Sequence, residues 1–467
     1  MQFVHLNTHS HYSKGWGIGS IEALCLSARE LGMESLALTD TNGLYGLIFF
    51  LQAARETGIQ PIVGSELTTD GRRAVLLVRN REGYANLCRI ISDLKCHQDF
   101  DLITGLRERR KGLIIFSDDF GLLKALKRDS MEDLFVEMSP GYNMHKCLAF
   151  SRSSGIPPLA TNRVYMVREE QFRLHRILRA VDMNSKLSRL GRDDTCREHN
   201  YLNSSQSMMD WFPHAPDAIE NSVRAGERCM KKWDIFALTF PSFEDMDDRD
   251  AFNHLYDKTM EGCKKRYGEI TKTVRDRVDH EMRIIHEKNF SHYFLVVADL
   301  AERAPRSCGR GSAAASIVSY ALGITHVDPI KHNLFFERFL NPGRLDPPDI
   351  DIDFAWDERD QVIDYLFGRH GNLRTAMVAN HNTFGARSAV REVAKVYGLA
   401  EQEICRFTER IGFGWRLKKV WKDLKGHPRM RGIEFNRPWN EILETAVQLE
   451  EYLNHLSVHC GGAGYRS

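Results

Sequence analysis

Residues 3–13 read FVHLNTHSHYS, a short apolar segment followed at once by two histidines and a serine-containing turn. Similar apolar segments recur at residues 36–39, 61–64, 74–78, 113–116, 134–137 and 157–160, with helical patterns between most of them. Repeated strand–helix units predict an α/β fold with a parallel sheet or a barrel. So many strands in so short a stretch favour a compact βα barrel over an open sheet.

Polar side chains follow the first three predicted strands. His9 and His11 come after the first strand, Asp40 ends the second, and Glu66 follows the third. Because groups at the carboxyl ends of barrel strands converge on one mouth, we expect these four side chains to lie close together. Two histidines and two carboxylates suit a divalent metal, although a His-x-His pair alone is more often a surface or core feature. A metal site and a hydrogen-bonded polar cluster are both compatible with this pattern.

The composition narrows the class of protein. A chain of 467 residues predicts two to four domains. Its 64 basic and 63 acidic residues leave a net charge of +1, which argues neither for nor against a nucleic-acid partner. Ten scattered cysteines without a C-x-x-C pair indicate reduced, cytoplasmic usage rather than disulfides or a zinc knuckle. We expect neither a signal peptide nor a membrane span.

A second informative stretch, residues 346–354, reads DPPDIDIDF. The prolines favour extended chain, and the residues after them alternate strictly between acidic and apolar. In a strand, Asp349, Asp351 and Asp353 share one face, and the apolar residues between them share the other. The apolar face must pack on a core, so this strand belongs to a sheet. Its acidic face needs compensation, for which Mg²⁺ is suited because it typically takes one or two carboxylates plus substrate phosphates.

The segment GRGSAAAS (309–316) places two glycines around Arg310, followed by Ser312 and an alanine-rich run. The simpler interpretation is a helix whose N-cap is Ser312 and whose small residues permit close packing. The alternative is a nucleotide-binding turn. Glycines such as Gly311 let backbone N–H groups approach a phosphate, and Arg310 and Ser312 add donors.

The stretch WRLKKVWKDLKGHPRMR (415–431) is strongly basic. Its apolar residues have the i, i+3, i+4, i+7 spacing of an amphipathic helix between residues 417 and 424. A solvated helix face is the simpler interpretation. Contacts to phosphates that do not read sequence are the alternative, through the residues Lys418, Lys419, Lys422 and Lys425.

Several motifs in the first part of the chain resemble one known domain. HSHYS, LALTDTNGLYG, ARETGIQPIVGSEL, NREGYANLCRII and LATNRVYMV resemble the polymerase-and-histidinol-phosphatase (PHP) domain. More narrowly, they are similar to the PHP domain that heads bacterial DNA polymerase III alpha subunits and their error-prone relatives. Metal-bearing members have further ligands where this chain has Thr41, Arg163 and Tyr165. The resemblance therefore implies a structural PHP domain, and Zn²⁺ or Mn²⁺ held by His9, His11, Asp40 and Glu66 is the alternative.

The second part resembles the palm of the C-family DNA polymerases, which is a polymerase-beta-like nucleotidyltransferase fold. The resemblance rests on CGRGSAAASIVSYALGITHVDP, LFFERFLNP, PDIDIDF and RDQVIDYLFGRHG. It implies that Asp349 and Asp351 are catalytic Mg²⁺ ligands, with Asp353 assisting on the same face. It also implies that Arg310, Gly311, Ser312 and Arg338 bind the incoming nucleotide. The implied reaction is attack of a primer 3′-hydroxyl on the α-phosphate of a deoxynucleoside triphosphate.

The order of parts in the family predicts the domain organisation. Residues 1–240 would form the PHP domain with connector helices, 241–395 the first part of the palm, 396–455 a helical thumb, and 456–467 the return to the palm. The thumb would grip duplex DNA. The region around NHNTF (380–384) is shorter than in the main replicative enzymes, which favours the error-prone branch. The third catalytic aspartate, the fingers and the clamp motif lie downstream in the family. We therefore expect a truncated chain without efficient polymerase activity of its own.

Three functions remain after these observations. The leading one is a DNA-directed DNA polymerase in replication or error-prone repair synthesis. Its partners would be primer–template DNA, deoxynucleotides and, in full-length relatives, the sliding clamp and other polymerase subunits. The second is a metal-dependent PHP phosphoesterase or 3′–5′ exonuclease, and the third is a non-catalytic DNA-binding fragment.

Overall fold

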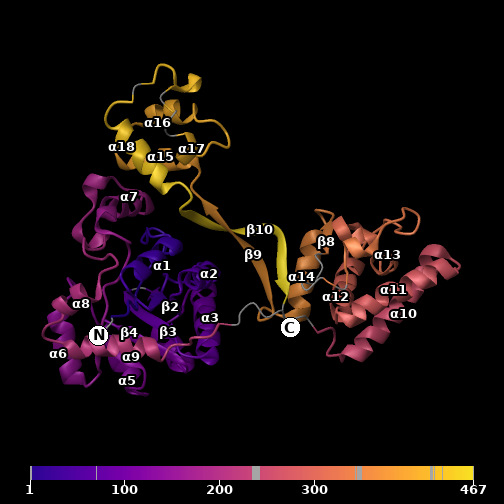
Figure 1. Ribbon diagram of the computed structural model, residues 1–467, viewed down its shortest axis with the longest axis horizontal. Coiled ribbons are helices and arrows are strands. Elements are labelled where there is room, and N and C mark those ends of the chain that lie inside the picture. The colour runs from indigo at the N-terminus through magenta and orange to yellow at the C-terminus, as the bar shows by residue number, and fades with distance from the viewer. Residues whose placement is uncertain are drawn as a thin grey trace. The chain divides into compact units, whose positions relative to one another are not determined.

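A computed structural model describes residues 3–69, 71–233, 242–341, 343, 350–420, 424, 426–433 and 435–465. The chain divides into two compact units. The first unit joins residues 1–233 to residues 381–456, and the second unit joins residues 234–380 to residues 457–467. Figure 1 labels their helices and strands. Each unit is described by itself below.

The first unit is built on a six-stranded sheet whose strands follow one another in chain order. The strands are β1 (Ser35–Leu38), β2 (Gln60–Thr69), β3 (Arg72–Val78), β4 (Leu113–Ser117), β5 (Leu134–Met138) and β6 (Pro158–Ala160). Each matches a segment predicted as a strand. The expectation of an all-parallel sheet is wrong, because β3 runs antiparallel to both β2 and β4. The β2–β3 connection is too short for a crossover helix, so it can only be a hairpin.

The first predicted strand, residues 3–6, lies in a segment that joins the two edges of the sheet. On the β1 side, the Ala37 amide donates to the His5 carbonyl at 3.0 Å. On the β6 side, the Val164 amide donates to the Asn7 carbonyl at 2.9 Å, and the His9 amide donates to the Val164 carbonyl at 2.8 Å. This segment connects both edges, as a barrel requires, so the predicted PHP-type βα barrel is confirmed in its essential features.

Helices surround this sheet (Figure 1). They are α1 (Ile21–Glu30), α2 (Leu47–Thr57), α3 (Arg81–Cys96), α4 (Leu102–Arg109), α5 (Phe120–Lys127), α6 (Met144–Ser154), α7 (Phe172–Asp182), α8 (Ser205–Trp211) and α9 (Pro216–Glu227). Polar side chains cap several of their N-termini, as Ser20 does for α1 and Asn80 for α3. Short 3₁₀ turns lie at η1 (Glu169–Gln171), η2 (Leu187–Arg189) and η3 (Arg192–Asp194).

The segment predicted as a thumb packs within the first unit. Its described helices are α16 (Glu401–Thr408), α17 (Leu417–Val420) and α18 (Trp439–Leu449), with a 3₁₀ turn at η7 (Pro428–Met430), and α15 (Ala386–Val396) precedes them in the chain. Their buried side chains form one hydrophobic core with α7. Val390 and Ile442 are fully buried there beside Ile177. The two compact units need not coincide with the domains of the family. The domain boundaries at residues 240, 395 and 455 therefore remain predictions.

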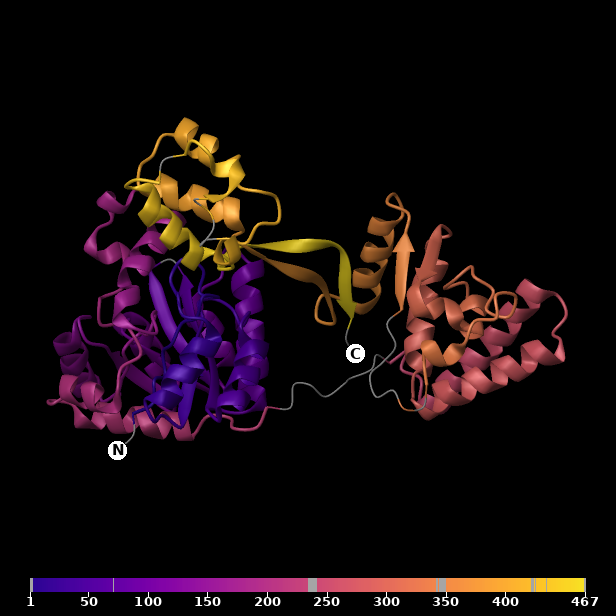
Figure 2. The same cartoon turned by 45° about the horizontal axis from the view of Figure 1, so that its top comes forward.

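The second unit combines five helices with a two-stranded antiparallel sheet among its described residues. The helices are α10 (Asp248–Tyr267), α11 (Lys272–Glu287), α12 (Ser291–Glu302), α13 (Ile317–Ala321) and α14 (Arg359–His370). The sheet pairs β7 (Ser307–Arg310) with β8 (Asp351–Phe354), and 3₁₀ turns lie at η4 (Gly311–Ala315) and η5 (Phe336–Arg338). Both views show α10 and α11 side by side (Figures 1 and 2).

A second two-stranded sheet crosses the division of the chain. β9 (Thr375–Thr383) pairs with β10 (Leu453–Tyr465), and the boundary between the units falls within both strands. No helix in the described part of the chain has the length and apolar character needed to cross a lipid bilayer.

Candidate functional site

Two arginines and three carboxylates meet at the mouth of the barrel. Arg73, at the start of β3, pairs with Glu66, Asp118 and Glu137. Arg163 approaches Asp118 at 2.6 Å and Glu137 at 3.0 Å. The side chain of Arg163 is only 9% exposed, and that of Glu137 is fully buried. The carboxylates that face the barrel mouth are therefore neutralised by protein cations.

The arginines set the charge state of these acids. Burial alone would raise the pKa of Asp118, but the guanidiniums of Arg163 and Arg73 outweigh it and lower that pKa to about 2. The pKa values of Glu66 and Glu137 are also lowered, because nearby arginines outweigh the same burial penalty. All three groups are carboxylates at neutral pH.

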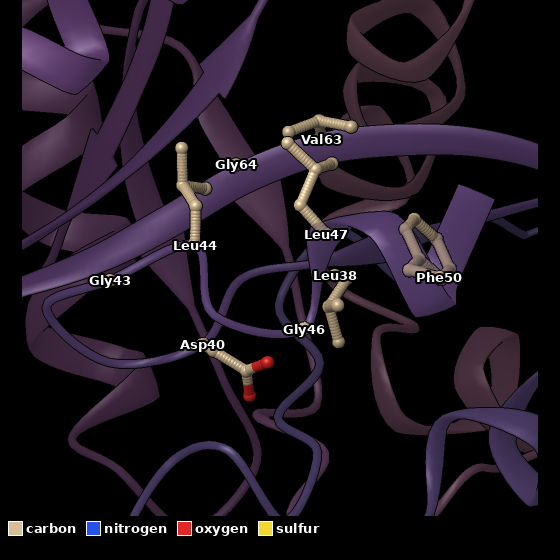
Figure 3. Close-up of a pocket in the computed structure, with 9 residues that line it drawn as sticks. All are labelled: Leu38, Asp40, Gly43, Leu44, Gly46, Leu47, Phe50, Val63 and Gly64. Carbon is tan, nitrogen blue, oxygen red and sulfur yellow. The ribbon is translucent and has the colours of Figure 1, made fainter. Parts of the chain in front are cut away.

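His9 and Asp40, two of the predicted PHP ligands, are joined through the Ser13 hydroxyl, which donates to Asp40 and lies 2.9 Å from His9 Nδ1. Asp40 accepts hydrogen bonds from the Ser10 amide at 2.7 Å, the Ser10 hydroxyl at 2.8 Å and the Ser13 hydroxyl at 2.7 Å. Figure 3 shows its carboxylate beside an apolar pocket formed by residues such as Leu38, Leu47 and Phe50. These hydrogen bonds leave Asp40 engaged with the protein, and the pocket contributes no further metal ligand.

The two histidines do not act as a pair. The His9 ring stacks on Tyr165 with centroids 4.5 Å apart, and its Nε2 lies 3.6 Å from a Glu66 oxygen. The chain turns at Ser10, so it is not extended beyond that residue. The His11 ring instead lies against Tyr12, at a centroid distance of 4.5 Å. Burial lowers the pKa of His11.

These residues do not fit a metal centre. Among the residues that the structure describes, no group of three or more His, Cys, Asp or Glu side chains is arranged to hold a metal ion. The resemblance to the PHP domain implies metal ligands at the positions of Arg163 and Tyr165, whose side chains here are a guanidinium and a phenol. Arg73, which the sequence interpretation missed, adds a second fixed cation. Asp118 and Glu137 were missed too, although both follow or end predicted strands, so the rule that identified Asp40 and Glu66 would have found them.

In the second unit, the glycine-serine turn and the acidic strand come together. β7 and β8 pair so that Arg310 lies directly opposite Asp351 and Cys308 opposite Asp353. The Arg310 guanidinium lies 3.2 Å from Asp353 and 3.6 Å from Asp351. Asp351 and Asp353 are exposed on one face, while Ile352 and Phe354 between and after them are half-buried, as the alternation predicts. Asp349 lies outside the described residues.

The turn after β7 differs from the expected capped helix. Gly311 has a φ of +71°, in the left-handed region that favours glycine. Gly311 begins the 3₁₀ turn η4, and Ser312 lies inside that turn. The prediction that Ser312 is a helix N-cap is therefore wrong. Ser316 caps α13 instead, because its hydroxyl accepts from the Ser319 amide. Ser312 is exposed, lies two residues after the end of β7 and makes no cap hydrogen bond.

Two residues of α11, the buried Glu281 and the half-buried Arg277, hold this turn in place. The carboxylate of Glu281 is fully buried and accepts hydrogen bonds from the Ser316 hydroxyl at 2.8 Å and the Ile317 amide at 3.0 Å. Burial raises the pKa of Glu281, and its hydrogen bond from Arg277 acts in the opposite direction. Arg277 also donates to the carbonyls of Ala315 and Leu334, both at 2.9 Å. It therefore connects the end of η4 to the segment just before η5.

The other predicted binding residues are exposed. Arg338 ends η5, which packs against η4, and its side chain reaches solvent. Lys418 and Lys419 lie in α17 and are also exposed. Lys418 pairs with Glu451 at 2.9 Å. Lys422 and Lys425 lie outside the described residues.

Two family models match successive parts of the chain. A model of the PHP domain matches residues 5–138, and a model of the bacterial DNA polymerase III alpha NTPase domain matches residues 253–463. The chain is 31% identical to the error-prone DNA polymerase of Symbiobacterium thermophilum over 99% of its own length. It is 34% identical to the DNA polymerase III subunit alpha of Bacillus subtilis, again over 99% of its length. The chain contains a PHP domain followed by a bacterial DNA polymerase III alpha NTPase domain.

The domain matches and the two relatives confirm the resemblance found in the sequence, with the PHP domain preceding the polymerase region. The chain spans about half the length of the curated relatives it matches, with 47% coverage of the first relative and 44% of the second. Among solved structures, an amidohydrolase from Chromobacterium violaceum matches 34% of the chain and 86% of its own chain, at 15% identity and a TM-score of 0.23. That likeness is too low to support an argument.

Proposed function

We propose that this chain is part of a DNA-directed DNA polymerase, and that its second unit binds an incoming deoxynucleoside triphosphate beside catalytic carboxylates. In this proposal Asp349, Asp351 and Asp353 are the catalytic acids. The reaction is attack of a primer 3′-hydroxyl on the α-phosphate, in replication or error-prone repair synthesis. Primer–template DNA and deoxynucleotides are the proposed partners, and the sliding clamp and other subunits would bind the full-length protein.

One observation carries the proposal: two motifs that are far apart in the sequence share one small sheet. The pairing of β7 with β8 puts Arg310 across from Asp351, and Ser312 follows only two residues later. Phosphate donors and carboxylates side by side are what a nucleotidyltransferase needs, because the triphosphate must lie next to the acids that hold its metal ions. A purely structural strand would not require two exposed carboxylates at alternate positions.

The residues present suit Mg²⁺ together with a nucleotide. Asp351 and Asp353 offer hard carboxylate oxygens on one exposed face. When bound, Mg²⁺ would activate the attacking hydroxyl and stabilise charge on the leaving group. Gly311 allows the backbone to approach a phosphate, while Ser312 and Arg338 supply donors to the triphosphate. Arg310, which pairs with the acids here, is free to turn toward phosphate oxygens because its side chain is 61% exposed.

Nucleotide binding tests the proposal directly. We expect the purified chain to bind radiolabelled dATP in equilibrium dialysis only when Mg²⁺ is present. Asp351→Asn and Asp353→Asn should each weaken that binding about tenfold or more, because each removes a negative oxygen from the metal site. Asp357→Asn is the matched control, since this nearby carboxylate is engaged by Arg306 at 2.6 Å. Equal dATP affinities in all four proteins, or no binding by any of them, would refute the proposal.

We propose a structural role for the PHP domain. The fixed cations Arg73 and Arg163 favour this role over a phosphoesterase or exonuclease, because they neutralise the acids that a catalytic metal would need. We also propose that residues 396–455 act as a thumb that contacts DNA through Lys418, Lys419, Lys422 and Lys425.

A further inference from the structure

The mouth of the barrel opens into a cavity to which the proposed functions assign no ligand. Its volume is about 800 Å³, within the range of small-molecule sites. All of its lining residues belong to the first unit. They include Tyr142, in the loop after β5, and three arginines besides Arg73, namely Arg163, Arg192 and Arg197. Several guanidiniums that face one cavity indicate a site for an anion.

The guanidinium of Arg163 has N–H groups left over. Its side chain is only 9% exposed. In the described part of the chain, only its Nη2 atom donates hydrogen bonds, to Asp118 and Glu137, and its Nε atom is buried without a partner. Because buried N–H groups are nearly always paired in folded proteins, those of Arg163 indicate a partner from outside the chain.

Two further arginines line the same cavity. The Nε atom of Arg197 is likewise buried without a partner among the described residues. Arg192 is exposed, and its guanidinium pairs with no carboxylate in that part of the chain. Asp193 lies 3.1 Å from Arg197, but its side chain is 94% exposed, so solvent screens this pair. The outer part of the cavity therefore has two guanidiniums against one solvated carboxylate.

One aromatic ring holds two of these arginines in place. The guanidiniums of Arg163 and Arg197 lie 4.4 and 5.2 Å from the centroid of the Tyr142 ring. The Tyr142 hydroxyl donates to the buried Asn200 side chain at 2.9 Å, and the same Asn200 oxygen accepts from the Arg197 amide at 2.7 Å. The two guanidiniums are therefore held close together before a ligand arrives, which reduces the entropy that binding costs.

The carboxylates deeper in the mouth are already engaged. Glu66, Asp118 and Glu137 all pair with Arg73, which lies on the same cavity wall. With Asp193, four carboxylates face four arginines across the whole mouth. Recognition of an anion there depends on directed N–H groups rather than on net positive charge.

We propose that this cavity binds the phosphate group of a small ligand directly, without a metal ion, through Arg163, Arg192 and Arg197. Three guanidiniums from separate backbone positions suit a tetrahedral oxyanion, whereas a single fork satisfies a planar carboxylate. Free phosphate and a phosphate monoester share this chemistry. The inference goes beyond the structural role proposed for the PHP domain. It is independent of the polymerase function, because it requires neither a metal ion nor DNA.

Equilibrium dialysis of the whole chain against radiolabelled inorganic phosphate, with and without EDTA, tests the inference. We expect the wild type to bind phosphate at millimolar concentrations in both conditions. Arg192→Gln should weaken binding about tenfold, because it removes a charged donor. Arg189→Gln is the matched control, since it removes an exposed arginine of the neighbouring turn η2 that does not line the cavity, and it should leave the affinity unchanged.

Competition by unlabelled methyl phosphate distinguishes the two sources of the phosphate group. Displacement of the label identifies a phosphate monoester as the ligand class, and no displacement identifies free phosphate.

Arg192 is exposed, so Arg192→Gln should unfold at the wild-type temperature when phosphate is absent, and lost binding is then not lost folding. The inference is overturned if the wild type binds no phosphate up to about 10 mM, or if Arg192→Gln binds it as well as the wild type. Binding that EDTA abolishes would place a metal ion in the mouth and contradict the inference. Equal weakening by Arg192→Gln and Arg189→Gln would contradict it too, because the effect would not belong to this cavity.

Discussion

At the scale of single residues, Arg163 decides the character of the barrel mouth. It lies at a left-handed backbone position, with φ of +49°, and its guanidinium stacks over the Tyr142 ring at 4.4 Å. With Arg73 it supplies two positive charges to three carboxylates. The sequence identified Arg163 as a fixed cation, but it could not identify Arg73, whose role depends on how β3 pairs with its neighbours.

We expect Arg163→Met to destabilise the chain by about 3–5 kcal/mol, because it leaves the buried Glu137 and its neighbouring acids with one cation instead of two. Urea-induced unfolding measures the loss. The matched control is Arg107→Met, which removes an ion pair to Asp129 whose side chains are both more than 40% exposed. It should cost less than about 1 kcal/mol. Similar losses for the two variants would show that the mouth is not held by Arg163.

The same substitution should change how stability depends on pH. The folded pKa of Asp118, about 2, lies below its ordinary value of 3.8, so its ion pairs stabilise the fold above the ordinary value. That stabilisation is lost as the pH falls from about 4 toward 2. Arg163→Met raises the folded pKa of Asp118 toward its ordinary value, so the loss of stability over this range should be shallower than in the wild type. Parallel pH profiles for the two proteins would contradict this assignment.

At the scale of elements, the sequence predicted strands better than their directions. Short apolar segments located β1 to β6, but they did not show that β3 runs antiparallel to β2 and β4. Residues 70 and 71, between those strands, are Asp-Gly, a strong signal for a two-residue hairpin that could have corrected the prediction. Ser312 was also wrongly predicted as a helix cap from its local sequence. That sequence cannot show that Ser316 and Glu281 accept the hydrogen bonds of the first backbone amides of α13.

We expect Glu281→Gln to loosen the start of α13. In the wild type, the backbone amides of Ile317 and Val318 donate hydrogen bonds to the Glu281 carboxylate. The glutamine side chain would place its own N–H donors beside those backbone N–H groups. The unmet donors should cost about 1–3 kcal/mol. Amide hydrogen exchange at Ile317 and Val318 should therefore accelerate about 5- to 150-fold. His280→Gln is the control, because its pair with Glu337 is exposed. Unchanged exchange at both amides would mean that Glu281 does not hold this turn.

At the scale of the whole molecule, two candidate metal-binding regions have opposite character. In the first unit, protein cations fill the mouth where the family's metal ligands would lie. In the second unit, two carboxylates are exposed beside a phosphate-suited turn and face a single, exposed arginine, Arg310. The sequence predicted both acidic motifs. How far protein cations neutralise the carboxylates of each motif depends on contacts between residues far apart in the chain. We propose that divalent metal binds with nucleotide in the second unit and not in the barrel.

Binding of Mn²⁺ to the protein in the presence of dATP, measured by equilibrium dialysis as the excess of Mn²⁺ on the protein side of the membrane, tests this claim most directly. We predict that the wild-type chain with dATP binds Mn²⁺ and that His9→Ala binds it equally well. The double variant Asp351→Asn/Asp353→Asn should lose that binding. Retention of Mn²⁺ by the double variant, together with its loss in His9→Ala, would contradict the claim and restore the metal-dependent phosphoesterase.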